Sequence, residues 1–179
     1  MFPILVFSVP FKESTYPYII NVKLIFTLDC LTDEKLTEMK LFYEAPICML
    51  VDNGESVGKG VYTCVHKQIT EVKGINVSGF VFKEKENCTD EMEDFLNYMD
   101  SLDEHIDIFL INKFSIFNQE TVQQLVSIMK KKKIKYLFFG HKEEKGLRSS
   151  DRTLVPVNQF YTFIYTDCSN QTGIDEFNI

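Results

Sequence analysis

The chain has 179 residues, of which 45% are hydrophobic, and it carries 26 acidic against 19 basic side chains. This apolar content can cover one continuous core, so disorder is expected only at the termini and in loops. The formal net charge of −7 repels polyphosphate on average, so a nucleic-acid partner is not expected without a local basic patch. Apolar runs stay far below the roughly 20 residues that span a bilayer, so no membrane partner is expected either.

The opening segment MFPILVFSVPF is apolar but has no basic residue before its apolar stretch, which Pro3 and Pro10 keep short. We therefore interpret Ile4–Val9 as a buried first strand rather than as part of a signal peptide. Five dispersed cysteines without a C-x-x-C pair favour a reducing compartment, so we expect the protein in the cytoplasm and also in the nucleus. Three N-x-S/T triplets, at Asn76, Asn87 and Asn170, are interpreted as accidental.

Tyr18–Phe26 has apolar residues at helical spacing and is predicted as a helix, although its β-branched and aromatic content also fits a strand. TDEKLTEMKLFY predicts a short helix or a loop, and PICMLV predicts a buried strand that stops at Asp52–Gly54. GVYTCVHKQITEV then alternates, with Tyr62, Cys64 and His66 on one face and Val61, Thr63 and Val65 on the other. It is predicted to pair with INVSGFVF in a β-hairpin that turns near Lys73-Gly74.

The segment TDEMEDFLNYMDSL predicts an amphipathic helix with an acidic outer face, because Asp90 and Glu93 have capping-box spacing and the apolar residues recur at helical intervals. IDIFLIN and IKYLFFG are predicted as strands buried on both faces. Between them, Asn118 is the predicted N-cap of a second helix, with Phe117 and Val122 as its hydrophobic staple.

This order of elements predicts a single α/β domain over residues 1–179, with a mixed, largely parallel sheet flanked by helices and a β-hairpin. NQFYTFIYT is predicted as a further strand. A polar tail is expected over about residues 167–179.

Motifs for catalysis or metal binding are incomplete. DNGESVGKG follows a buried strand, but its glycine spacing does not fit a phosphate loop, and we interpret it as a flexible hairpin connection. The three histidines, His66, His105 and His141, are scattered, and Cys64 beside His66 supplies only two of the three or four ligands that zinc needs. We therefore expect no metal, no cofactor and no catalytic residue.

An enzyme nevertheless remains an alternative. A nucleophilic Cys48 or Cys88 would need a base within reach, and buried, inert cysteines are the simpler interpretation. A ligand site would be expected at the C-terminal ends of the parallel strands, around Asn112–Ser115 and Gly140–His141.

The cluster Lys130–Lys135 falls at the end of the second predicted helix, where cations interact favourably with the exposed carbonyls. Nucleic-acid sites interleave charge with aromatic or arginine residues, and here only Tyr136 is near. We interpret the cluster as a helix end, and three further roles stay open: nuclear import, an acidic protein partner, and an RNA- or ribosome-associated function. The candidate partner-binding residues are Lys130, Lys131, Lys132 and Lys133.

The order of elements resembles that of the proteasome assembly chaperone 2-type family, which are α/β proteins without catalytic activity. The resemblance runs through ILVFSV, YEAPICMLVDNG, GVYTCVHKQITEVKGINVSGF, MEDFLNYMDSL and IDIFLINKFS, and this chain would be a reduced member. It implies a non-catalytic chaperone or adaptor that pairs with a related subunit as a heterodimer and binds proteasome α-ring surfaces.

Chaperones of the wider group insert a C-terminal tail of the form hydrophobic-tyrosine-any residue between proteasome α subunits. Here the last residues are Phe177, Asn178 and Ile179, which keep the hydrophobic residue but lack the tyrosine. The resemblance implies that this tail binds the partner.

Overall fold

The computed structural model describes residues 4–7, 21–28, 30–54, 60–83, 89–112, 119–139, 153–154, 163–166 and 172–175. The helices are α1 (Asp33–Phe42), α2 (Thr89–Ser101) and α3 (Gln119–Lys132). The strands are β1 (Ile4–Phe7), β2 (Leu24–Thr27), β3 (Ile47–Val51), β4 (Val61–Val65), β5 (Ile69–Val72), β6 (Ile75–Phe80), β7 (Ile108–Ile111), β8 (Tyr136–Phe139), β9 (Thr153–Leu154), β10 (Phe163–Thr166) and β11 (Thr172–Asp175). No helix in these ranges combines the length and the hydropathy needed to cross a membrane.

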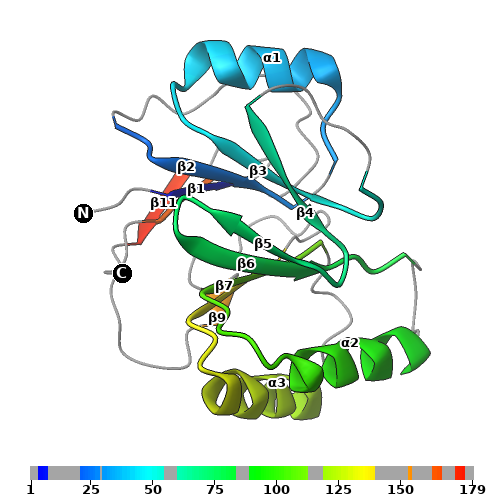
Figure 1. Ribbon diagram of the computed structural model, residues 1–179. Helices are drawn as coiled ribbons and strands as arrows, with labels where there is room; N and C mark the ends of the chain where they lie inside the picture. The colour runs from blue at the N-terminus through cyan, green and yellow to red at the C-terminus, as the bar shows by residue number, and fades with distance from the viewer. Residues whose placement is uncertain are drawn as a thin grey trace.

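These elements form four layers (Figure 1). Sheet A has the strand order β11-β10-β1-β2-β3-β4, and sheet B has the order β5-β6-β7-β8-β9. The sheets pack face to face, with α1 outside sheet A and with α2 and α3 outside sheet B (Figure 1). The predicted α/β class, with mixed, largely parallel strands and a β-hairpin, is confirmed. Its strands divide between two sheets.

The division lies within the segment predicted as one long hairpin strand. The turn at Lys73-Gly74 is confirmed: both residues have positive φ, 55° and 80°, as a two-residue type I′ turn requires. Only β5 pairs with β6 across this turn, however, because the strand is interrupted by a bend at His66–Gln68. Before that bend, β4 pairs in parallel with β3 in sheet A. The connection after β3 therefore joins parallel strands and is not the hairpin that was predicted.

Alternation along β4 explains how this strand serves two cores. Tyr62 and Cys64 face the cluster between the sheets, whereas Val61 and Val65 pack with α1 on the outer face of sheet A. Apolar side chains from both sheets fill the space between them, including Phe26 and Phe138, whose ring centroids lie 6.1 Å apart.

The helices follow their sequence signals with small corrections. Thr32 caps α1 by accepting a hydrogen bond from the Lys35 N–H at 3.4 Å, which settles the choice between helix and loop. Because α2 begins at Thr89, Asp90 lies inside the first turn and is not the N-cap that its spacing predicted. Phe95 and Met99 of α2 are fully buried, as its periodicity predicted.

The second predicted helix is confirmed as α3, and two of its apolar residues pack against sheet B. Leu125 and Met129 are fully buried against sheet B, and Val126 is partly exposed. The staple residues Phe117 and Asn118, and the side chain of Val122, lie outside the described residues.

A further prediction, the helix at Tyr18–Phe26, is wrong where the structure describes it. Residues 24–27 form β2 and not a helix end, because all four side chains are buried and a strand covered on both faces loses its alternation. The segment predicted as a polar tail contains β11, which pairs antiparallel with β10. Residues 21–23 of the predicted helix are not helical, and Tyr18–Ile20 and residues 176–179 lie outside the described residues.

Close packing of the two sheets can be tested at Gly79, in β6. A Cβ added there would lie 2.5 Å from Leu50 Cδ1, 3.1 Å from Cys64 Sγ and 3.1 Å from the Leu110 carbonyl oxygen. Leu50 and Cys64 belong to sheet A and are buried, so they can make room only by shifting against their neighbours, and Gly79→Ala should lower the free energy of unfolding by about 1–3 kcal/mol in urea titrations. Gly54→Ala is the control, since its Cβ would meet only Val65 at 3.9 Å. Equal stability of the two variants would contradict the face-to-face packing.

Candidate functional site

An open groove of about 640 Å³ lies between strand β5 and the C-terminal end of α2. Ile69 and Glu71 supply the strand side, and Tyr98, Leu102, Asp103 and Glu104 supply the helix side. Ile69 also packs against the apolar cluster under α2, so its side chain faces the helices. Glu71 points to the same face, because side chains two positions apart on a strand share a face.

The strand beside this groove, β5, is the first strand of sheet B, and among the described strands its one ladder neighbour is β6. Val72 pairs with Ile75 and Thr70 pairs with Val77, so the residues between them alternate in orientation. After a two-residue turn, this alternation directs the N–H and C=O groups of Ile69 and Glu71 away from β6. No backbone hydrogen bond joins these outward groups to another part of the described chain. Within the part of the chain that the structure describes, the outer edge of β5 is therefore open.

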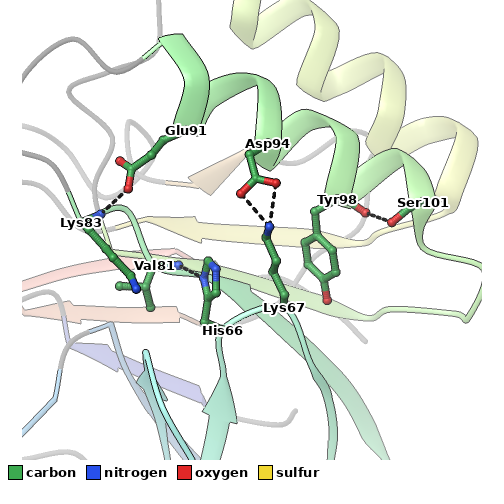
Figure 2. A network of polar contacts seen from close by, with 8 residues as sticks. All are labelled: His66, Lys67, Val81, Lys83, Glu91, Asp94, Tyr98 and Ser101. Atoms are coloured by element: carbon green, nitrogen blue, oxygen red, sulfur yellow. Dashed lines mark hydrogen bonds and ion pairs between the residues drawn. The ribbon is translucent and has the colours of Figure 1, made fainter.

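Polar contacts hold α2 against the segment that leads into β5, at one end of the groove (Figure 2). Lys67 adopts a left-handed backbone with φ of 57°, and its Nζ lies 2.6 Å from both carboxylate oxygens of Asp94 on α2. The same ammonium lies 5.5 Å from the centre of the Phe80 ring. Lys67 is consequently occupied in holding α2 against the start of β5.

His66 is held by the backbone of the neighbouring strand. Its Nδ1 accepts a hydrogen bond from the Val81 N–H at 2.9 Å (Figure 2), which leaves the proton of the neutral ring on Nε2. Burial, followed by the charge of Lys67, lowers the pKa of His66 below its ordinary value. A neutral ring that accepts from the backbone has a structural role here.

Tyr98 fixes the helix side of the groove to sheet B. Its hydroxyl lies 2.7 Å from Ser78 Oγ, and Ser78 in turn donates to the Gln68 carbonyl at 3.0 Å. Burial raises the pKa of Tyr98, although the bond with Ser78 acts in the opposite direction. The tyrosine therefore stays a neutral phenol that links α2 to the beginning of β5.

The groove is acidic. Glu71, Asp103 and Glu104 line it and are exposed. Among the described residues that line the groove, Lys67 is the cation, and Asp94 neutralises it. This charge favours an occupant that carries positive charge.

The lysine cluster ends α3 as predicted, and two of its members contact α2. Lys131 Nζ lies 2.7 Å from Asp100 Oδ1, and Lys132 Nζ donates to the Leu102 carbonyl at 2.8 Å. The hydrogen bond from Lys131, aided by its charge, lowers the pKa of Asp100. The acidic surface that these two lysines face is thus the end of α2.

Backbone hydrogen bonds close the end of α3. The Ile134 N–H donates to the Met129 carbonyl at 2.9 Å and the Lys133 N–H donates to the Lys130 carbonyl at 3.4 Å, which is the Schellman pattern. Lys133 occupies the left-handed position with φ of 58°, where glycine is usual. Ile134 returns to the core beside Met129.

This geometry predicts opposite effects at two neighbouring lysines. Lys133→Gly should raise the free energy of unfolding by about 0.5–1 kcal/mol, because glycine adopts positive φ without steric cost. Lys130→Gly should lower it by about 1 kcal/mol, because Lys130 lies inside the helix. Both changes remove one positive charge, so urea titrations separate the backbone effect from the electrostatic one. Equal shifts in one direction would contradict the Schellman ending.

Of the residues considered for a catalytic or ligand site, Cys48 and Asn112 lie in the described ranges. Cys48 is fully buried, and desolvation raises its pKa to about 12, which disfavours the reactive thiolate. Burial also raises the pKa of Cys64. Asn112 accepts from the Phe82 N–H at 2.8 Å and donates to the Phe82 carbonyl at 3.0 Å, so its amide extends a backbone pairing.

Other candidates divide into placed and unplaced residues. His105 Nε2 lies 3.1 Å from Asp107 Oδ1 in the loop before β7. Within the described ranges, no three metal-ligating side chains gather. Cys88, residues 113–118, Gly140, His141 and the tail Phe177–Ile179 lie outside those ranges.

Comparison of the chain with protein-family models, with curated proteins and with solved structures gives no match. The resemblance to proteasome assembly chaperones therefore stays a prediction.

Sequence reasoning missed the groove residues, above all Ile69, Glu71 and Tyr98. A signal was present, since Gln68, Thr70 and Glu71 put polar and charged groups into a strand segment between apolar strands. Charged residues are typical of strands at sheet edges, where they oppose uncontrolled pairing.

Proposed function

We propose that this protein is a non-catalytic α/β chaperone or adaptor that acts by binding other proteins. The supporting observation is the open edge of β5 beside the groove, because an exposed strand edge next to a helix can accept an extended segment of a partner as an additional strand. Main-chain hydrogen bonds then supply affinity, and side-chain pockets supply specificity.

The partner class comes from the resemblance in element order. On that basis we propose that the protein pairs with a related subunit and binds proteasome α-ring surfaces in the cytoplasm and the nucleus. The tail Phe177–Ile179 is proposed as a second contact with the α subunits.

Recovery of purified proteasome α subunits on the tagged chain tests this function. Glu71→Pro should abolish recovery, because proline removes the outward N–H of β5 without removing a bond to β6. Glu71→Thr, which changes the same charge and keeps the N–H, should retain most of it. Deletion of Phe177–Ile179 should weaken it.

Circular dichroism and urea titration of each variant establish that it is folded. Failure of the unmodified chain to recover any of the purified α subunits would contradict the proposal.

A further inference from the structure

We propose that the groove beside β5 binds a basic extended segment of a protein partner. Every second side chain of this segment faces the groove, and these side chains are alternately basic (Lys or Arg) and aliphatic. This inference rests on the proposed function and names the chemistry of its partner. It combines the open backbone of the edge strand, the directions of two side chains and the charge of the groove.

The backbone fixes how such a segment would lie. Ile69 and Glu71 present two N–H and two C=O groups to the open edge, spaced as one strand requires of the next. An incoming strand that uses these groups runs along β5, between it and the C-terminal end of α2. Its residues opposite Ile69 and Glu71 then point to the same face as those two side chains.

The side chains fix the pattern. A residue opposite Ile69 would lie beside Ile69 and Leu102, and an aliphatic side chain suits this part of the groove. A residue opposite Glu71 would meet its carboxylate, with Asp103 and Glu104 on the helix side. Lys or Arg suits that position, because opposite charges in a cross-strand pair stabilise strand pairing.

The acidic rim also selects against a second copy of this chain. Pairing of two β5 edges would bring Glu71 of each copy close to the other and would add the carboxylates of both α2 ends. Like charges opposite one another destabilise strand pairing. With a formal net charge of −7, the whole chain also repels its own copies. A basic partner avoids this repulsion, and its positive charges are attracted by the same carboxylates.

Fluorescence anisotropy with the full chain and a fluorescein-labelled peptide tests the inference. The peptide repeats the order Lys-Thr-Val-Thr, so lysine and valine alternate on one face and threonine occupies the other. We expect saturable binding that weakens at high salt. Replacing lysine by glutamate in the peptide should abolish it. In the protein, the combined change Glu71→Gln, Asp103→Asn and Glu104→Gln should weaken binding at least tenfold.

The matched control changes the same amount of charge outside the groove, through Asp90→Asn, Glu93→Gln and Glu120→Gln. These three exposed residues do not line the groove, so this variant should bind the peptide within about twofold of the unmodified chain, a difference well below 1.4 kcal/mol. Equal weakening in both triple variants would overturn the inference, since it would mean attraction by net charge alone.

Backbone N-methylation of the peptide separates strand addition from other basic-peptide binding. Successive residues of a strand direct their N–H groups to opposite edges, so only one alternate set of amides can bond to β5. Methylating that set should abolish binding and methylating the other set should preserve it. Binding that survives both modifications would overturn strand addition.

The outcomes distinguish this inference from the proposed function. Recovery of α subunits that resists the groove triple variant, together with failure of the peptide to bind, overturns the basic-strand inference and leaves the adaptor function standing. Peptide binding with all the expected dependences, without recovery of α subunits, supports the inference and overturns the partner class.

Discussion

The bend at His66–Gln68 is the constraint on which the arrangement of this protein depends. Three backbone hydrogen bonds hold it: His66 N–H to the Val51 carbonyl in sheet A, Lys67 N–H to the Gly79 carbonyl in sheet B, and Gln68 N–H to the Val65 carbonyl within the turn. They join the last residue of β3 to the second-last residue of β6 through one short segment. The bend turns the chain out of sheet A, so β5 starts a second sheet, in which it has one neighbour and one open edge among the residues that the structure describes.

The same segment also positions the helix that forms the other side of the groove. Lys67 forms an ion pair with Asp94 on α2. The Gln68 carbonyl accepts a hydrogen bond from the Ser78 hydroxyl, which is also hydrogen bonded to Tyr98 on α2. At the far end of α2, Lys131 neutralises Asp100 and Lys132 occupies the Leu102 carbonyl. Asp103 and Glu104 are left exposed beside β5. The groove thus has fixed walls, a free strand edge and an unbalanced negative charge.

Sequence patterns predicted the elements whose buried side chains follow a single periodicity. The stripe of α2, the apolar strands β7 and β8 and the lysine-rich end of α3 each follow from one periodicity or one helix-end rule. The bend before β5 was not predicted, because residues 61–72 alternate between apolar and polar side chains in the same way whether the chain runs straight or bends. What bends it is a left-handed Lys67, and no residue-type preference announces that conformation in lysine.

The candidate site was even less accessible from sequence. Its walls come from residues about 30 positions apart, such as Glu71 and Asp103, and its openness depends on which strand lacks a second neighbour. The contact between Lys131 and Asp100 is likewise a long-range pairing that the helix-end interpretation could not name. Such features require the sheet order, which depends in turn on the bend.

Amide hydrogen exchange along β5 in the free protein tests the open edge most directly. Thr70 and Val72 point their N–H groups to β6, whereas Ile69 and Glu71 point theirs to the groove. Slow exchange at Thr70 and Val72, with fast exchange at Ile69 and Glu71, is the predicted result. Equally slow exchange at all four amides would mean that another part of the chain covers β5 and would contradict the groove as a docking surface.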